Sequence, residues 1–518
     1  MKQNQRKTAE GILFTDQYQL TMAQLYFRMG MHEQTVQFDH FFRQYPDYGE
    51  HKAGFCINAG LEWLLDWMTE SSFRDEDIDL LRSQNGRMGK PVFQEDFLAW
   101  LRENGNFANI SLKAIPEGRV IHPNEPITVV EGPLAIAQLL ETPLLNHLNY
   151  PILIATKAAR IRLSGQGQPL LEFGLRRGHG TGANAGARAA LIGGADFTSN
   201  VGISHVLGFP PKGTHGHSMV QAFMAIGMGE LEAFRAYADC YPDDCLLLVD
   251  TIDTINSGIP NAITVFEELQ KKGHQAVGIR LDSGDFAALS VRAIKMLNQA
   301  GFSETIIVLS DNLDELRIIE ILEKITEVAP RNGLDADEII KRLSYGVGTH
   351  LITSQGASAL GGIYKLTAVK KQGQCLPSYK ISESSQKIHN PGVKNVWRLY
   401  DQKNKAMADM LCLNEENPNE QQSIDLYEVD SAEKKSINHA ELSKIEPLFV
   451  DIIRKGKLVY ELPTIEEMRE VRQMDLARLE TGIKDLIKPD HYPVLLSHKL
   501  YELRTNLIQS GRNNLTAG

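Results

Sequence analysis

The chain has 518 residues, more than one hydrophobic core normally supports, so we expect two or three structural units. Hydrophobic residues make up 42% and charged residues 23%, as in an ordinary globular protein. The net charge of −11 and the lack of a long Lys/Arg run argue against binding to nucleic acid or to an anionic membrane. Five scattered cysteines without CxxC spacing indicate reduced thiols and no zinc site. No signal-peptide core precedes the first motif and no apolar run reaches about 18 residues, so we expect a cytoplasmic protein.

Residues 1–145 combine helical and strand patterns. Apolar residues recur at helical spacing over 15–30, which predicts a helix there. Alternating and β-rich runs predict strands over 34–42, 111–115 and 127–132. We therefore predict an N-terminal α+β domain.

Residues 146–370 have a different rhythm, in which short apolar runs alternate with helical segments. The predicted strands lie within 170–174, 196–200, 246–251, 276–285, 305–314 and 343–352. The predicted helices lie within 183–193, 218–238, 260–272, 286–300 and 312–326. This alternation is typical of a parallel sheet. Most of these strands end in charged, hydroxyl or glycine residues, which favours a β/α barrel with its site at the carboxyl ends, although a doubly wound sheet gives the same alternation.

Residues 371–518 form the third segment. Strands are expected within 393–413, and helices over 464–484 and 496–508. Residues 414–443 are polar and charged, which predicts a long surface loop.

A glycine-rich turn with two arginines, GLRRGHGTGANAGARAA (174–190), follows one predicted strand and opens a helix. Backbone N–H groups at such a helix start can bind an anion, and Arg176 and Arg177 can pair with a phosphate or carboxylate. The alternative is a flexible turn with solvated arginines. The spacing does not fit the dinucleotide fingerprint.

The turn KGTHGHS (212–218) carries two histidines before another helix. A histidine here can act as a ligand, a general base or a nucleophile. The alternative is an ordinary helix start with Ser218 as its cap. No cysteine or third histidine is adjacent, so a metal site is the lesser option.

Two further strand ends carry candidate site residues. In GIRLDSGD (278–285), Arg280 can pair with an acid, and Asp282 and Asp285 can hold Mg²⁺ or ribose hydroxyls, unless the three form a structural ion pair. In YGVGTHL (345–351), Gly348 and Thr349 form a turn of the kind that cradles phosphate, on the last strand of the series. The segment DTIDTINSG (250–258) adds hydroxyls and aspartates to this set of strand ends.

These motifs together resemble the nicotinate phosphoribosyltransferase family, in content and in order, over almost the whole chain. The motifs are TDQYQLTM (15–22), FDHFFR (38–43), GLRRG (174–178), KGTHGHS (212–218), DTIDTINSG (250–258), GIRLDSGD (278–285), YGVGTHL (345–351), LGGIYKL (360–366), PGVKNVWR (391–398) and HYPVLLSHKLYEL (491–503). The resemblance implies an α/β fold: an irregular β/α barrel over 146–370, an N-terminal open sandwich over 1–145, and a segment 371–518 that completes the sandwich and adds helices. It also implies a homodimer with its active site at the subunit interface.

The resemblance further implies an activity and roles for individual residues. The activity is ATP-dependent transfer of a phosphoribosyl group from 5-phosphoribosyl 1-pyrophosphate to nicotinate, which gives nicotinate mononucleotide for NAD biosynthesis, with Mg²⁺ as cofactor and no dedicated protein site for the metal. His217 is the histidine that becomes phosphorylated, and His215 lies at a variable position. The remaining implied site residues are Tyr18, Thr214 and Arg280 for nicotinate, and Arg177, Asp282, Gly348 and Thr349 for the phosphoribosyl donor.

The sequence departs from the family pattern at two places, and two alternative functions are compatible with it. The motif GLRRGHG stands where the family has alanine and glutamine after the arginine pair, and the segment 325–342 is longer than in the family. A nicotinamide phosphoribosyltransferase on the same scaffold is the alternative enzyme. A non-catalytic binding protein that kept the fold is the alternative outside enzymes, although intact His217, Arg280 and GVGT argue against it.

Overall fold

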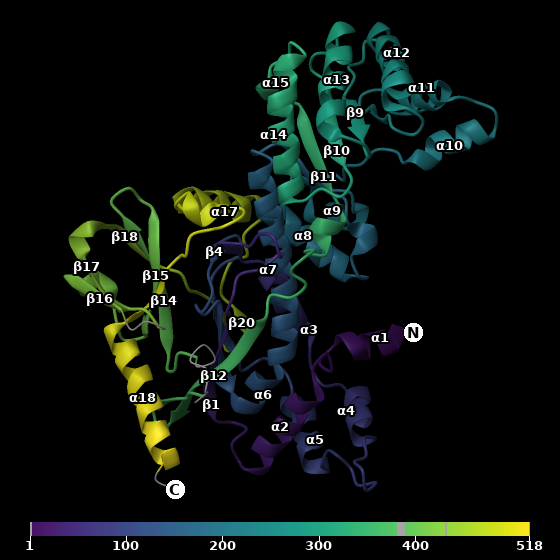
Figure 1. The fold of residues 1–518 in the computed structure, drawn as a ribbon. Coiled ribbons are helices and arrows are strands. Elements are labelled where there is room, and N and C mark those ends of the chain that lie inside the picture. Colours follow the sequence, from purple (N-terminus) through teal and green to yellow (C-terminus); the bar gives the residue numbers. More distant parts are fainter. Residues whose placement is uncertain (1–2, 381–388, 430–432, 517–518) are drawn as a thin grey trace. The chain divides into compact units, whose positions relative to one another are not determined.

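The computed structural model describes residues 3–380, 389–429 and 433–516 (Figure 1). The chain divides into two compact units. Unit 1 comprises Met1–Leu153 and Ala359–Gly518, and unit 2 comprises Ile154–Ser358. These boundaries differ from the expected 145 and 370. Strand β12 (Gly362–Lys371) therefore belongs to unit 1, where it pairs with β1 (Thr35–Phe42).

The main sheet of unit 1 has seven strands, paired antiparallel throughout. Its order is β13 (Gln374–Pro377), β12, β1, β5 (Thr128–Pro133), β3 (Ser111–Ala114), β19 (Val450–Arg454) and β20 (Lys457–Leu458). Every residue of β1 after Thr35 is buried, so side chains on both faces of this central strand are covered. The ring of Phe38 on β1 stacks on Tyr364 of β12, with centroids 4.6 Å apart. Helix α2 (Gln17–Arg28) confirms the helix predicted over 15–30.

A second sheet of unit 1 is built from the C-terminal segment. Its order is β17 (Lys434–Asn438), β16 (Ser423–Tyr427), β21 (Val494–Ser497), β15 (Ala406–Leu413), β14 (Lys394–Asp401) and β18 (Leu442–Pro447). The predicted surface loop over 414–443 is wrong in part, because β16 and β17 pair antiparallel in it and bury Ile424, Leu426 and Ile437; residues 430–432 lie outside the described residues. Helices α17 (Ile465–Arg478) and α18 (His498–Thr516) confirm the two predicted C-terminal helices.

Unit 2 contains a six-stranded sheet in which every pair is parallel. Its order is β7 (Phe197–Thr198), β6 (Leu170–Glu172), β11 (Leu343–Val347), β10 (Ile306–Ser310), β9 (Gly278–Leu281) and β8 (Leu246–Leu248). The order is cyclic, because neighbours along the chain are neighbours in the sheet and the first strand, β6, pairs with the last, β11. Among the described residues only β7 and β8 stay unpaired with each other. The sheet is therefore open between β7 and β8.

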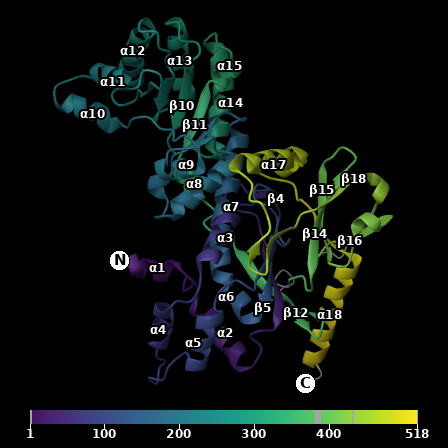
Figure 2. The same cartoon turned by 180° about the vertical axis from the view of Figure 1, so that it is seen from behind.

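The helices of unit 2 follow the strands as expected, with one correction (Figure 2). They are α8 (Gly182–Gly193), α9 (Val201–Leu207), α10 (His217–Ala225), α11 (Glu230–Cys240), α12 (Ile259–Lys271), α13 (Phe286–Gln299), α14 (Glu315–Arg331), α15 (Ala336–Lys341) and α16 (Thr349–Ile352). The single helix predicted over 218–238 is wrong: α10 and α11 are separate, since Gly227 at φ +84° ends the first. The long segment 325–342 is accounted for by the end of α14 and by α15.

All five cysteines are free thiols. None of the helices in the described part of the chain combines the length and the apolarity that a membrane span requires.

Candidate active site

Arg280 lies at the centre of a group of polar side chains at the carboxyl ends of the unit 2 strands. It is the third residue of β9, and its side chain is 17% exposed. Its Nε donates to Ser310 Oγ at 2.7 Å, Nη1 donates to Thr214 Oγ1 at 3.2 Å, and Nη2 donates to Asp282 Oδ1 at 2.8 Å. A guanidinium has five N–H groups, so these bonds leave one on each terminal nitrogen. Arg280 can therefore still bind an anion.

An aromatic ring lies beside this guanidinium. The Arg280 Cζ lies 5.6 Å from the centroid of Phe173, the residue after β6. The ring packs on Gly346 of β11, where a Cβ would lie 2.5 Å from the Phe173 ring, so only glycine leaves room for it. The half-buried Phe173 and the two free N–H groups of Arg280 together suit a flat, anionic ring compound.

His217 begins α10 and faces a hydroxyl and two carboxylates. Its Nδ1 shares a hydrogen bond of 3.1 Å with Thr251 Oγ1. Its Nε2 lies 3.7 Å from Asp282 Oδ2 and 3.9 Å from Asp250 Oδ1. The side chain is 37% exposed, so the ring is accessible to a substrate. The two carboxylates thus lie on the Nε2 side of the ring, and the Thr251 hydroxyl lies on its Nδ1 side.

His215, two residues earlier, has a different environment. Its side chain is buried, and its Nε2 accepts a hydrogen bond from the Leu248 N–H at 3.1 Å. Burial, together with the positive charges of Arg280 and His217, lowers its pKa to about 4. The structure thus distinguishes two histidines that the sequence leaves equivalent in chemistry: one ring is open to the site and the other is enclosed.

Three aspartates of this region each stand just after a strand, and two of them, Asp250 and Asp282, lie beside His217. Asp250 follows β8, Asp282 follows β9 and Asp311 follows β10. Asp250 Oδ2 accepts hydrogen bonds from the Asp282 N–H at 2.9 Å and from Ser283 Oγ at 2.6 Å, whereas its buried Oδ1 has no hydrogen-bond partner. Burial raises the pKa of Asp311, and the charges of Asp282 and Asp250 raise it further. The negative field in this corner suits a cation or a substrate hydroxyl.

The backbone at Asp311 is unusual. Asp311 and Asn312 have φ of 138° and 44°, values that non-glycine residues rarely adopt. This turn directs the chain away from β10 immediately after Ser310, whose hydroxyl also donates to Asp282 Oδ1. Backbone strain of this kind is concentrated at functional sites.

The two loops expected to hold the phosphoribosyl donor are neighbours in unit 2. Arg177 ends the short 3₁₀ helix Leu175–Arg177 and is exposed, and Thr349 begins α16 after Gly348. The two elements touch: a Cβ on Gly174 would lie 2.5 Å from Ile352 Cβ, and a Cβ on Gly348 would lie 3.2 Å from the Phe173 carbonyl. Their roles in donor binding stay predictions.

Two other candidates are Asp285 and Tyr18. Asp285 is exposed and caps α13, where its Oδ1 accepts hydrogen bonds from the N–H groups of Ala287 and Ala288 at 3.2 Å each. Tyr18 belongs to unit 1, on α2, and is 48% exposed. Its contact with nicotinate stays a prediction.

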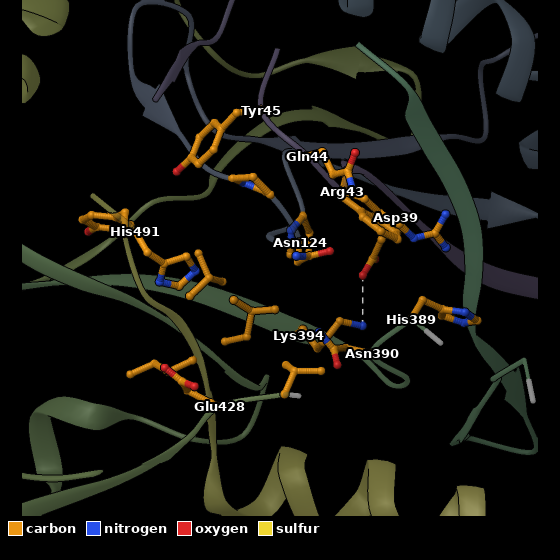
Figure 3. A pocket seen from close by; sticks show the side chains of 18 of the residues that line it. Asp39, Arg43, Gln44, Tyr45, Asn124, His389, Asn390, Lys394, Glu428 and His491 are labelled. Atoms are coloured by element: carbon orange, nitrogen blue, oxygen red, sulfur yellow. Dashed lines mark ion pairs between the residues drawn. The ribbon is translucent and has the colours of Figure 1, made fainter. Parts of the chain in front are cut away.

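Unit 1 contains a pocket of about 540 Å³ where two of the sequence motifs meet (Figure 3). Asp39 and Arg43 come from FDHFFR and Lys394 comes from PGVKNVWR. The Lys394 ammonium lies 2.9 Å from Asp39 Oδ2, and both side chains are almost fully buried. Burial lowers the pKa of Lys394, although the Asp39 charge opposes the shift. This pair ties β14 to β1.

Three residues of the group around Arg280 and His217, namely Asp250, Thr251 and Ser310, have no role assigned from the sequence. Each follows or ends an apolar strand, which is the signal that drew attention to DTIDTINSG and to the end of β10. That signal could not assign them, because their partners Asp282, His217 and Arg280 lie 28 to 34 residues away.

Comparison with known proteins agrees with the motifs. Residues 13–149 match the nicotinate phosphoribosyltransferase (NAPRTase) N-terminal domain, 170–408 match the nicotinate phosphoribosyltransferase (NAPRTase) family and 393–504 match its C-terminal domain. A nicotinate phosphoribosyltransferase of Bacillus subtilis (strain 168) is 38% identical over 506 residues, which cover 97% of this chain and 96% of the relative. The chain belongs to the nicotinate phosphoribosyltransferase family.

A human relative and solved structures agree with this assignment. The human protein named nicotinate phosphoribosyltransferase is 32% identical over 547 residues, covering 96% of each chain. The crystal structure of human nicotinic acid phosphoribosyltransferase superimposes with a TM-score of 0.78 at 30% identity, over 95% of this chain and 99% of that one. A nicotinate-nucleotide pyrophosphorylase from Pyrococcus furiosus shares the fold, with a TM-score of 0.65 at 21% identity, over 92% of this chain and 99% of that one.

Proposed function

We propose that the protein transfers a phosphoribosyl group from 5-phosphoribosyl 1-pyrophosphate to nicotinate and forms nicotinate mononucleotide for NAD biosynthesis. In this proposal, ATP hydrolysis drives the transfer through a phosphohistidine at His217. One observation carries the proposal: Arg280, with two free N–H groups beside Phe173, lies in one group with His217 and its carboxylates. The family relatives named nicotinate phosphoribosyltransferase support it.

Nicotinate differs from nicotinamide by its carboxylate, and Arg280 is the partner that we assign to it. Charge-assisted bonds from a partly buried guanidinium are strong and selective. Thr214 holds Arg280 in place through Nη1, and Phe173 offers a face for the pyridine ring. Tyr18 is assigned to the same ring from the family resemblance.

The phosphoribosyl donor is assigned to Arg177, Asp282, Gly348 and Thr349. The adjacency of the 3₁₀ helix Leu175–Arg177 and α16 supports a shared phosphate site at these strand ends. Asp282 Oδ2 is not used by Arg280 and is available for a ribose hydroxyl.

The transfer itself requires little acid–base chemistry. The pyridine nitrogen attacks the ribosyl carbon, the bond from that carbon to pyrophosphate breaks, and positive charge develops on the sugar. The protein contributes alignment of the two substrates and negative groups near the developing charge. Asp282 and Asp311 are placed to supply such groups.

His217 is assigned the coupling step. A ring nitrogen attacks the terminal phosphorus of ATP, the bond from that phosphorus to the bridging oxygen breaks, and ADP leaves. The Asp250 and Asp282 carboxylates, 3.9 and 3.7 Å from Nε2, stabilise the positive charge on the ring. Thr251 holds the other nitrogen and fixes the ring orientation.

Mg²⁺ is part of the proposal. Carboxylate oxygens are its usual protein ligands, and the unpartnered Asp250 Oδ1 together with Asp282 fits that preference. In the described ranges, three or more His, Cys, Asp or Glu side chains nowhere come close enough to hold a metal together. The ion would therefore be held by one or two carboxylates and by substrate phosphates, whose charge it neutralises.

The proposal also covers the fold of unit 2, the oligomeric state and the cellular location. The unit 2 sheet, with its cyclic order and one open edge, is an irregular β/α barrel. The protein is a homodimer whose active site lies at the subunit interface. It works in the cytoplasm on small molecules.

The decisive experiment is formation of nicotinate mononucleotide from nicotinate and 5-phosphoribosyl 1-pyrophosphate, with and without ATP, and with nicotinamide in parallel. We expect product from nicotinate, a rate or yield raised by ATP, and at least about tenfold poorer use of nicotinamide, since an amide cannot form the charged pair with Arg280. Equal or better use of nicotinamide would overturn the substrate assignment. No effect of ATP would overturn the coupling.

A further inference from the structure

The segment 209–216 lies where a closed barrel would pair β7 with β8. It forms no helix or strand, yet it hydrogen-bonds to both open edges. The Lys212 N–H donates to the Thr198 carbonyl on β7 at 3.1 Å. The Leu248 N–H on β8 donates to His215 Nε2 at 3.1 Å. The segment therefore bridges the open edge of the sheet with one bond on each side.

The bond from Leu248 follows from the geometry of an edge strand. Successive N–H groups of a strand point to opposite sides, and the Val249 N–H donates to the Arg280 carbonyl on β9. The N–H of Leu248 therefore points away from β9, toward the open edge. It needs an acceptor there, because a buried unpaired N–H is costly. The imidazole of His215 takes the place of a strand carbonyl.

The surroundings of His215 keep its ring in this role. The side chain is enclosed by α11, with ring centroids 4.9 Å from Tyr237 and 6.0 Å from Phe234. Burial is the main cause that lowers its pKa to about 4, so the ring is neutral at physiological pH. Since Nε2 accepts, the proton is on Nδ1, where the Gly216 carbonyl lies 3.4 Å away.

The same loop and the same strand also meet in the active site. His217 follows His215 by two residues, and Thr251 follows Leu248 by three. Two hydrogen bonds therefore join this loop to β8 and its end: a buried one between His215 and Leu248, and an exposed one between His217 and Thr251. The buried hydrogen bond fixes the distance between the turn that carries His217 and the strand end that carries Asp250.

We propose that His215 is a positioning residue, which anchors the KGTHGHS turn to the edge of β8 and thereby holds His217 against Thr251 and Asp250. This inference rests on the proposed function for the role of His217. The hydrogen bond between His215 and Leu248 does not depend on that function and is tested separately, by hydrogen exchange at Leu248.

The experiment uses the full chain with His215→Leu, which has no acceptor, and His215→Gln, whose amide oxygen restores one. His274→Leu is the matched control, since His274 precedes β9 at the opposite end of the sheet and its side chain pairs with the surface residue Asp243. Three quantities are measured: hydrogen exchange of the peptide containing Leu248, the ATP turnover rate, and the KM for nicotinate.

In His215→Leu we expect exchange at Leu248 to accelerate about tenfold or more, because the N–H loses its acceptor. ATP turnover should fall by a similar factor, whereas the KM for nicotinate should change less than about twofold, since Arg280 keeps its bonds to Ser310 and Asp282. His215→Gln should recover most of both losses. His274→Leu should match the unmodified protein.

Unchanged exchange at Leu248 in His215→Leu would overturn the anchor. Faster exchange with unchanged ATP turnover would overturn the link to His217. If the unmodified protein shows no ATP turnover, the proposed coupling and the link to His217 both fail, and exchange at Leu248 still decides on the anchor. In the unmodified protein, ¹⁵N shifts must show the His215 proton on Nδ1; a proton on Nε2 would overturn the anchor without any variant.

Discussion

Arg280 and Thr214, 66 residues apart in the chain, are joined by a hydrogen bond of 3.2 Å from Nη1 to Oγ1. The bond ties the turn before α10 to β9. It therefore connects the residue assigned to the nicotinate carboxylate with the loop that carries His217.

Replacing Arg280 by alanine should abolish efficient use of nicotinate. The substrate carboxylate would lose its partner in a partly buried site, which costs about 2–5 kcal/mol, or about 30-fold or more in kcat/KM. Steady-state kinetics with nicotinate measure this. Arg292→Ala on the exposed side of α13 is the control. A normal KM for nicotinate in Arg280→Ala would refute the assignment.

Replacing Thr349 by valine should weaken binding of 5-phosphoribosyl 1-pyrophosphate more than binding of nicotinate. The change removes one hydroxyl at the start of α16 with little change in volume. We expect the donor KM to rise about tenfold or more, because a hydrogen bond to a charged group contributes about 1.5–3 kcal/mol. Thr326→Val on α14 serves for comparison. A donor KM unchanged within error would make this turn structural only.

Incubation with ATP labelled in its terminal phosphate should give a protein label that is labile in acid and stable in base. A phosphoramidate on imidazole has these properties, whereas a phosphate ester on the neighbouring Ser218 has the opposite ones. His217→Asn should lose both the label and the stimulation by ATP, but keep some ATP-independent transfer, since the contacts proposed for nicotinate and for the donor do not pass through this side chain. His215→Asn should still accept label, since the His215 ring is buried and bonded to Leu248. An acid-stable label would refute the phosphohistidine.

The fourth prediction concerns stability and pH in unit 1. Glu446 on β18 accepts hydrogen bonds from Arg119 Nη1 at 3.3 Å and Nη2 at 3.0 Å, and from Tyr400 at 2.6 Å. Burial tends to raise its pKa, but the Arg119 charge and these bonds outweigh it and lower the pKa from 4.5 to about 2. The ionised form is therefore favoured in the folded state.

Because the folded pKa is depressed, the stability that Glu446 adds is fully present above about pH 4.5 and is lost as the pH falls toward about 2. Glu446→Gln should lower the free energy of unfolding by up to about 3 kcal/mol at pH 7. Urea unfolding at pH 7, 4 and 3 should show that this deficit in unfolding free energy becomes smaller as the pH falls. The exposed Glu470→Gln on α17 should show no deficit at any of the three. A deficit of constant size would contradict the ionic origin.

Several features could be predicted from the sequence because they depend on local pattern. The alternation of apolar runs and helices predicted the parallel strands of unit 2, and the polar residues after those runs are the ones that the structure gathers around Arg280. The resemblance assigned phosphorylation to His217, which stays a prediction, and the structure shows that this ring is exposed. The structure adds that Asp285, one of the candidate metal or ribose ligands, is used as the cap of α13.

Other features could not be predicted because they depend on contacts between distant segments. Gly362–Lys371 looked like the end of the barrel segment, yet this strand completes the sheet of unit 1 by pairing with β1. The polar stretch 423–438 looked like a loop, but its alternating Ile424, Leu426 and Ile437 become buried once the two strands pair.

By itself, the sequence determined where the strands end and which chemically active groups stand there, since these follow from hydrophobic periodicity and residue type within a few neighbours. Only the tertiary structure decided which of these groups meet. The parallel register pairs Arg280 with Leu248 on one side and with Val308 on the other, and thereby brings Asp250, Asp282 and Ser310 to one edge. His215 is buried against α11 and accepts a hydrogen bond from the Leu248 N–H at the edge of β8, whereas His217 stays exposed. Both decisions depend on packing between segments that the linear pattern does not encode.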